Sequence, residues 1–547
     1  MPQKIQTQAG GFSSLPRKQV VITMAGVMLA MFLGSLDQTV VGTAMPRIIS
    51  ELGGFGQYTW VTTAYMITSA VVVPITGKLT DIYGRRIFYI AGVAIFTVGS
   101  IACGFSQNIT EIIFFRAFQG IGAGVMMANA FTTIGDLFPP AVRGKYQGLM
   151  SSVFALSSII GPTLGGFITD YFSWHWIFFV NIPLGIAVIF LFIFFFPNIR
   201  RDNLKHTIDY TGVALLVVAV VPLLLALSWA DVEYPWASPE ILGMLGLSVV
   251  SLVFFILQER RSQEPIVPIM LFKNRIVSIS TVMNFLIGFG MFGTTIFIPL
   301  FFQGVLGDRA TTSGSFLTPM SLGTVFGSFL SGQFLSRTGG HYRTQGAIGL
   351  AIMTTGFFLL SRMGMTTSHL AAVINMVITG FGMGITMPLY IISVQNAVEY
   401  KFLGAATSVT AFTRSIGGTV GLSVFGSLMT NRFVSQVTLK MPADVKSIIS
   451  PSQLAAVIHN PQALFTADAQ AQLLGFFSKA GQEASTLYNE MITVLRQAMS
   501  AAIAHVFFVA FFIVLAGFIL NFFLKEIPLR THHTIEPEQP QKKDTQE

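Results

Sequence analysis

One carboxylate, Asp37, lies inside a long apolar stretch that runs from about Val21 to Pro46. This stretch is long and apolar enough to cross a lipid bilayer as one helix. An ionisable group at that depth is costly unless it has a partner charge, a bound proton or a water-filled cavity. Reversible protonation is the chemistry that such a group offers, so Asp37 is the first candidate for a proton-carrying site.

Arg116 is the expected partner of Asp37. The first helix should run outward, which puts Asp37 in its outer half, roughly 10 Å from the outer end. The segment that begins near Glu111 should run inward and bring Arg116 to a similar depth. A nearby guanidinium favours the ionised carboxylate, whereas burial favours the protonated form, so a change of access would load and release a proton. The alternative is a fixed ion pair that only locks two helices together.

A polar cluster follows the second apolar segment, from Gly77 to Arg86. Its glycines permit a tight turn, and its carboxylate can accept hydrogen bonds from arginine or from a helix N-terminus. We interpret the cluster as a conformational latch. The alternative is a basic loop that only fixes orientation. The latch residues are Gly77, Asp81, Gly84, Arg85, Arg86 and, at the end of the fourth segment, Asp136.

Other polar residues are scattered through apolar segments. The chain contains 51 Phe and 24 Met, so these groups would line an apolar, adaptable substrate pocket or simply form interhelical hydrogen bonds. Arg414 has no carboxylate at its expected depth, and an anionic substrate, the carbonyl ends of broken helices or a solvated cavity would each account for it. The pathway candidates are Gln38, Tyr65, Asn129, Asn284, Gln303, Asn375, Tyr390 and Arg414.

The composition identifies the class of protein that must position these residues. The 547 residues are 52% hydrophobic and only 10% charged, whereas soluble domains contain about 25% charged residues. Apolar segments of about 20 residues recur along the chain, which predicts an all-α polytopic membrane protein. The net charge of +8 does not indicate nucleic acid, because most Lys and Arg fall at alternate ends of the segments. This bias predicts that both termini are cytoplasmic.

Fourteen membrane spans are expected. They cover about 20–44, 58–78, 87–106, 111–134, 146–170, 175–197, 210–229, 240–257, 276–302, 312–336, 344–361, 369–394, 402–430 and 500–524. Residues 77–86 and 332–340 form a weak repeat after the second span of each half, which is typical of transporters that rock around a central site. The expected units are a cytoplasmic tail (1–19), a six-helix bundle (20–200), an inserted hairpin with linkers (201–262), a second six-helix bundle (263–525) and a cytoplasmic tail (526–547).

The segment 431–499 is expected to be an extracellular loop within the second bundle. Apolar residues around Leu464, Leu473, Phe476 and Phe477 favour a short amphipathic helix, with a solvated loop as the alternative. No spacing typical of metal ligands, of a nucleophile elbow or of a phosphate-binding loop occurs. We therefore expect neither an enzyme, a metal nor a cofactor. The expected partners are membrane lipids, protons and small hydrophobic or cationic substrates, bound by a monomer.

Together these segments resemble the major facilitator superfamily, and within it the drug:H⁺ antiporter family with fourteen helices, which contains the QacA and EmrB multidrug exporters. Leu36 to Pro46 is similar to that family's first-helix motif, although Gly42 stands where the family usually has Asn. Gly77 to Arg86 resembles the superfamily's loop motif, and Arg116 to Gly124 its fourth-helix motif. Trp174 to Pro183 resembles the signature at the sixth helix.

The antiporter motif of the fifth helix is matched by Gly161, Pro162, Gly165 and Gly166. The resemblance implies a major facilitator fold, with Asp37 and Arg116 in proton coupling. It also implies that Asp81, Arg85 and Asp136 stabilise an outward-facing state against the start of the thirteenth helix near Leu403, and that the antiporter motif shapes a hinge.

The expected function is proton-driven export of hydrophobic or cationic drugs and toxic amphiphiles across a bacterial cytoplasmic membrane. Two alternatives remain open. One is a dedicated exporter of a single metabolite, antibiotic or lipid. The other is a non-transporting receptor or sensor on a transporter scaffold, which would need no titratable Asp37.

Overall fold

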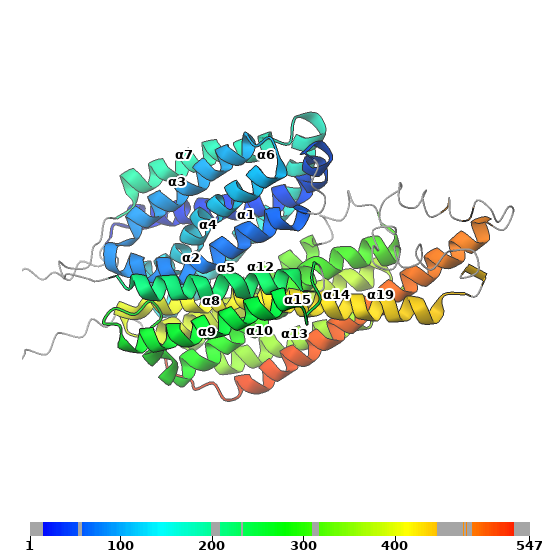
Figure 1. The fold of residues 1–547 in the computed structure, drawn as a ribbon. Coiled ribbons are helices and arrows are strands. Elements are labelled where there is room, and N and C mark those ends of the chain that lie inside the picture. The colour runs from blue at the N-terminus through cyan, green and yellow to red at the C-terminus, as the bar shows by residue number, and fades with distance from the viewer. Residues whose placement is uncertain are drawn as a thin grey trace, which may run out of the picture.

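A computed structural model describes residues 15–52, 57–197, 208–230, 233–308, 317–442 and 484–529, together with residues 444, 445, 474 and 477. Within these ranges the long elements are all helices (Figure 1). They are α1 (Arg17–Leu52), α2 (Tyr58–Tyr83), α3 (Arg85–Gly104), α4 (Ile109–Leu137), α5 (Pro140–Tyr171), α6 (Trp176–Phe179), α7 (Asn181–Phe195), α8 (Tyr210–Trp229), α9 (Pro239–Arg261), η3 (Ile269–Lys273), α10 (Arg275–Phe301), η4 (Phe302–Leu306), α12 (Thr318–Thr338), α13 (Tyr342–Ser361), α14 (His369–Ala397), η5 (Tyr400–Phe402), α15 (Leu403–Lys440) and α19 (Ala484–Asn521).

The helices form the two expected bundles and the expected hairpin. In the first bundle α1 packs on α5 and α7, while α2 and α3 pack on α4. In the second bundle α10 packs on α15, and α12 and α13 pack on α14. Among the described residues, 12 helices are long and apolar enough to cross a membrane, and α12 and α15 occupy the places of the tenth and thirteenth expected spans. The all-helical, polytopic architecture predicted from the sequence is confirmed.

Local sequence signals fix the ends of the helices that carry the candidate site. Asn108 precedes α4, and its side chain accepts a hydrogen bond from the Glu111 backbone N–H at 2.9 Å. Glu111 reciprocates by accepting from the Gln107 backbone N–H, so the pair resembles a capping box. Between α2 and α3, Gly84 has a φ of +88°, a conformation that favours glycine.

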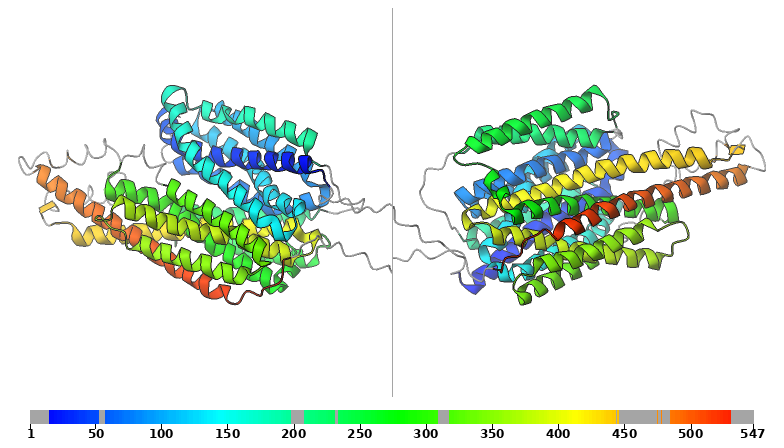
Figure 2. Two further views of the ribbon diagram at one scale, coloured as in Figure 1. Left: turned by 180° about the vertical axis from the view of Figure 1, so that it is seen from behind. Right: turned by 90° about the horizontal axis from the view of Figure 1, so that it is seen from below.

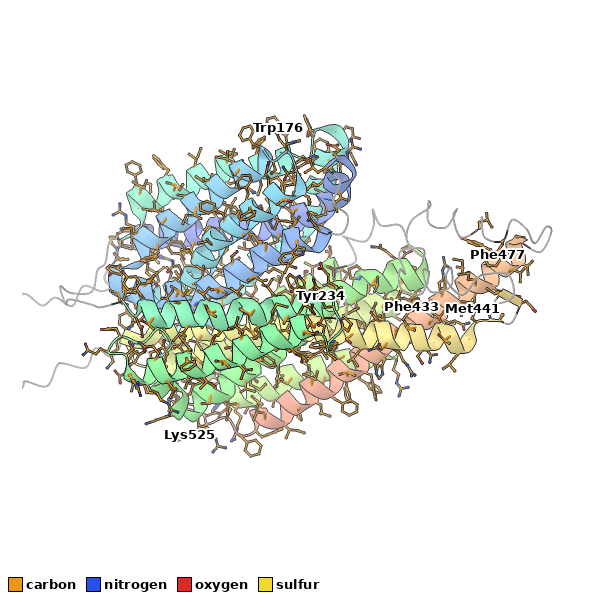
Figure 3. All side chains as sticks on the ribbon, in the orientation of Figure 1. Trp176, Tyr234, Phe433, Met441, Phe477 and Lys525 are labelled. Carbon is orange, nitrogen blue, oxygen red and sulfur yellow. The ribbon has the colours of Figure 1, made fainter. Side chains whose placement is uncertain are left out.

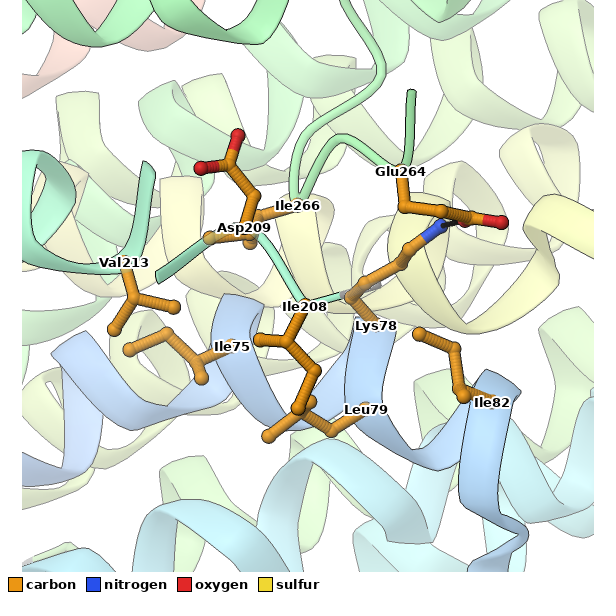
Figure 4. Close-up of a pocket in the computed structure, with 9 residues that line it drawn as sticks. All are labelled: Ile75, Lys78, Leu79, Ile82, Ile208, Asp209, Val213, Glu264 and Ile266. Carbon is orange, nitrogen blue, oxygen red and sulfur yellow. Dashed lines mark hydrogen bonds and ion pairs between the residues drawn. The ribbon is translucent and has the colours of Figure 1, made fainter. Parts of the chain in front are cut away.

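The inserted hairpin α8–α9 packs against both bundles, because α8 contacts α2 and α15. Figure 4 shows where the hairpin and its linker meet the end of α2, with Lys78 and Glu264 pointing toward one another. Their Nζ and Oε2 atoms are 2.5 Å apart. Nearby, the buried Glu259 accepts hydrogen bonds from the backbone N–H groups of Ile266 and Val267. The hairpin is therefore attached next to the predicted latch.

The thirteenth and fourteenth helices are longer than expected. At 38 residues each, α15 and α19 extend roughly 57 Å, about twice the thickness of a bilayer core. Figures 1 and 2 show both helices projecting beyond the other elements. In Figure 3, Phe433, Met441 and Phe477 gather at this projecting end, and all three are buried in the core of the second bundle.

The extracellular loop expected over 431–499 is therefore helical at both ends, up to Lys440 and from Ala484. The polar residues after residue 430 predict the end of the thirteenth span there, but α15 and α19 bury apolar side chains against each other beyond that point. The amphipathic helix expected around Leu464 and Leu473 lies outside the described residues.

Candidate functional site

Asp37 and Arg116 form the predicted ion pair in the interior of the first bundle. Arg116 Nη1 on α4 donates a hydrogen bond to Asp37 Oδ2 on α1 at 2.5 Å. Each residue is only 1% exposed. Burial this complete removes both charges from water, so each depends on the other for its stability.

Two amides complete the environment of the carboxylate. Gln119 Nε2 on α4 and Asn181 Nδ2 at the start of α7 each donate to Asp37 Oδ1 at 2.9 Å. Gln119 also accepts from Arg116 Nη1 at 2.8 Å, and Asn181 donates to Ser100 Oγ on α3 at 2.9 Å. The carboxylate therefore gathers hydrogen bonds from three side chains on two further helices.

Gln119 and Asn181 are not among the site residues predicted from the sequence. A signal was present for Gln119, because it follows Arg116 by one helical turn and so shares its face. Asn181 stood in the signature before Pro183, but nothing in its spacing pointed to Asp37. Tyr65, a predicted pathway residue, also belongs here: its ring faces the Arg116 guanidinium, with Cζ 4.1 Å from the ring centroid.

The antiporter motif on α5 packs directly against the helix that carries Asp37. A Cβ atom on Gly161 would lie 1.9 Å from Thr39 Oγ1, and one on Gly165 would lie 2.2 Å from Thr43 Oγ1. Thr39 donates to the Ser157 carbonyl across this interface at 3.1 Å. Gly166 has open space around it, and Pro162 lies within the uninterrupted helix. The motif thus sets the distance between α1 and α5 two residues from Asp37.

The predicted latch joins the two bundles. Asp81 Oδ2 at the end of α2 accepts a hydrogen bond from the Ala405 backbone N–H at 3.0 Å. Phe402, which precedes α15, supplies no side-chain cap, so Asp81 caps α15 from the other bundle. A Cβ atom on Gly404 would lie 2.3 Å from Asp81 Oδ1, and one on Gly77 would lie 1.9 Å from Ser408 Oγ.

Arg85 organises the acids of the latch, whereas Arg86 lies apart. Arg85 Nη2 donates to Asp81 Oδ1 at 2.6 Å, and its Nε donates to Asp136 Oδ2 at 2.9 Å. Arg86 instead donates to the Ile193 carbonyl on α7, within the first bundle. The family resemblance implied a contact between Asp81 and the start of the thirteenth helix, and the bond from Ala405 on α15 to Asp81 is this contact.

A second polar contact between the bundles was missed. Arg143 at the start of α5 donates to the carbonyl of Gly135 and to Gln395 Oε1 on α14. Gln395 in turn donates to the Phe131 carbonyl at 3.2 Å. The sequence carries no signal for this contact, because Arg143 and Gln395 are 252 residues apart.

A third contact between the bundles involves the second copy of the weak repeat, residues 332–340, and lies at the same face as the contacts of Asp81 and Arg143. A Cβ atom on Gly332, which matches Gly77 in the repeat, would lie 2.2 Å from the Gly144 carbonyl oxygen on α5. Thus α2 packs on α15 and α12 packs on α5, in matching positions of the two halves. The bundles are held together at the face where α1 begins and α19 ends.

The remaining pathway candidates do not converge on one pocket. Asn129 and Asn284 are buried and donate to carbonyls of their own helices. Asn375 and Tyr390 connect helices of the second bundle, through the Leu359 carbonyl and Asn521 respectively. Gln38 is exposed beside Asp37, and Gln303 is half-buried in η4.

An apolar groove lies elsewhere, between α12 and α14. Its volume is about 610 Å³. The lining residues are Thr318, Pro319, Leu322, Gly323, Phe326, Val377 and Phe381. None of the pathway candidates lines it.

Comparison with known proteins found a matching family model and several similar sequences. A family model described as Major Facilitator Superfamily matches residues 27–422. The chain is 38% identical to the multidrug transporter protein MdtP of Bacillus subtilis, over 93% of each chain. It is 36% identical to multidrug resistance protein 3 of the same organism, over 92% of this chain and 95% of that one.

A fungal relative, the rubrofusarin-specific efflux pump aurT of Gibberella zeae, is 31% identical over 79% of this chain and 81% of its own. The crystal structure of the human organic anion transporter MFSD10 aligns with a TM-score of 0.57 and 13% identity, covering 91% of this chain and all of that one. At that identity the structural match concerns the fold alone.

Proposed function

The chain belongs to the major facilitator superfamily, and on this premise we propose that it exports hydrophobic amphiphiles, cationic drugs among them, in exchange for protons. The observation that carries the proposal is the buried Asp37–Arg116 pair, held by Gln119 and Asn181. The similarity of the chain to two multidrug proteins of Bacillus subtilis supports export as the direction of transport.

In the proposed cycle Asp37 alternates between two partners, Arg116 and a proton. Protonation of the carboxylate would remove the negative charge that Arg116 contacts and weaken the attachment of α1 to α4. Because Gly161 and Gly165 pack α5 tightly on α1, a shift of α1 would move α5 as well. α5 also contacts α12 of the other bundle, so a change of proton occupancy at Asp37 would reach the interface between the bundles.

We infer that the structure represents the outward-facing state. If both termini are cytoplasmic, the face closed by Asp81, Arg143 and Gly144 is the cytoplasmic one. Opening this face would break the bond from Ala405 to Asp81 and the contact of Arg143 with Gln395. In a bacterial cytoplasmic membrane, such export would confer resistance to the antibiotics among the substrates.

The breadth of the substrate range is the point on which the alternatives differ. Two relatives are multidrug proteins and a third is named for one compound, so a dedicated exporter is the second candidate. A growth-inhibition screen with varied toxic compounds distinguishes the two, since a dedicated exporter would protect against few of them or none.

The test of coupling compares the native chain with Asp37→Asn in the same screen and in dye efflux from cells. We expect Asp37→Asn to lose protection and efflux at unchanged membrane abundance. Asp308→Asn, the same change at a partly exposed pair with His369, should behave like the native chain. Undiminished efflux by Asp37→Asn, or efflux that survives collapse of the proton gradient, would refute proton coupling.

A further inference from the structure

Arg414, which is half-buried, has no acidic partner among the described residues. It lies about three helical turns after Leu403 on α15, within the membrane-spanning part of the second bundle. Its guanidinium lies over the ring of Phe131 on α4, with Cζ 5.6 Å from the ring centroid. No described carboxylate forms a salt bridge with it, and no described acceptor forms a hydrogen bond with it.

The surroundings of Arg414 are built to admit this side chain. Gly288 on α10 lies directly beside it, and a Cβ atom at that position would lie 2.1 Å from the Arg414 carbonyl oxygen and 3.1 Å from its Cγ. The absence of a side chain at Gly288 thus leaves room for the stem of the arginine. Phe131 belongs to the first bundle, so the guanidinium lies between the two bundles, one turn outward of Gly135, which contacts Leu403.

The buried aspartates of the described residues are already paired with other arginines. Asp37 is paired with Arg116, and Asp81 and Asp136 are paired with Arg85. A charged side chain within a membrane costs several kcal/mol unless a partner compensates it. A cation–π contact returns only a part of that cost. Arg414 is therefore a position at which a bound anion would gain a charge-assisted contact that the protein itself does not supply.

We propose that Arg414 binds the carboxylate of a transported amphiphile whose apolar body lies against the surrounding aromatic and aliphatic side chains. The planar guanidinium suits a carboxylate because it can donate two parallel hydrogen bonds. This inference rests on the export function proposed above and names a substrate class for it. Compounds that carry a carboxylate, zwitterions included, are favoured over compounds whose only charge is positive.

The experiment uses two dyes with the same body: a rhodamine with a free carboxylate and its methyl ester. Binding to the purified full chain is measured by fluorescence polarisation, and transport is measured in liposomes with an imposed pH gradient. We expect Arg414→Gln to weaken binding of the carboxylate dye by at least about tenfold, the loss of one charge-assisted interaction, and binding of the ester by less than about twofold. Arg414→Lys should retain part of the discrimination, because it keeps the charge but not the planar fork.

Arg362→Gln is the matched control, because Arg362 is exposed on the surface of the second bundle and also lies over an aromatic ring, with Cζ 5.1 Å from the Phe358 centroid. The same loss of charge there should change carboxylate binding by less than about twofold. The proposal is overturned if the native chain binds neither dye, if Arg414→Gln weakens both dyes equally, or if Arg362→Gln reproduces its effect. If both dyes bind as expected but the pH gradient moves neither, the export function fails while the carboxylate site stands.

Discussion

Arg116 in the first bundle and Arg414 in the second both lie beside an aromatic ring, but they differ in their other partners. Arg116 is 1% exposed and donates to Asp37 and Gln119, with the Tyr65 ring alongside. Arg414 has an aromatic ring alongside as well, but no described acid or acceptor. The Asp37 carboxylate already has protein partners, so a proton could replace the Arg116 guanidinium as its partner. Arg414 has no described acid beside it, so its guanidinium could bind an anionic ligand. In the proposed mechanism, the two bundles therefore have different chemical roles.

Removing each arginine in turn tests this difference most strongly. Arg116→Ala should destabilise the protein by about 3–5 kcal/mol, because it leaves the Asp37 carboxylate buried and unpaired. Arg414→Ala should cost only about 0.5–1 kcal/mol, the value of a cation–π contact. Denaturant unfolding in detergent, followed by tryptophan fluorescence, measures both.

The double variant Arg116→Ala with Asp37→Asn sharpens the result. It removes both charges, so most of the lost free energy of unfolding should return. A similar loss for the two single arginine variants would contradict the distinction between a paired and an unpaired cation.

Substitution of the α5 glycines that pack on α1 near Asp37 should have a smaller effect on stability, confined to the first bundle. Gly161→Ala should destabilise by about 1–3 kcal/mol through overpacking against Thr39 and should slow dye transport several-fold, since it displaces α1 near Asp37. Gly166→Ala is the control, because a Cβ atom there meets nothing within 4 Å. Transport rates and unfolding curves of the two variants check this. Equal behaviour would show that the motif does not act through the α1–α5 distance.

The repeat permits a comparison of the two halves at the latch. Asp81→Asn weakens the cap of α15, which is worth about 1 kcal/mol, and should raise the cytoplasm-open population roughly fivefold. Ser336, at the matching place in the other half, is exposed, and Ser336→Ala should leave the population unchanged. Spin labels at the exposed positions Ile87 and Arg337 would report the distance between the bundles. An unchanged distance distribution in Asp81→Asn would refute the latch.

The sequence predicted the elements whose signals are local. The number and order of helices followed from apolar segments, and the contact of Asp37 with Arg116 followed from helix direction and depth. Contacts that depend on how distant helices are oriented were missed, such as Asn181 with Asp37 and Arg143 with Gln395. The extension of α15 beyond the membrane was also missed, because its buried Phe433 and Val437 are interspersed with polar residues that suggested a loop.

The central claim is that Asp37 carries the transported proton. Its most direct test is proton movement in liposomes that contain the purified protein and a trapped pH-sensitive dye, with a substrate gradient as the driving force. The native chain should move protons opposite to the substrate. Asp37→Asn should bind the substrate and move no protons above protein-free liposomes. Proton movement by Asp37→Asn at the native rate would contradict the account.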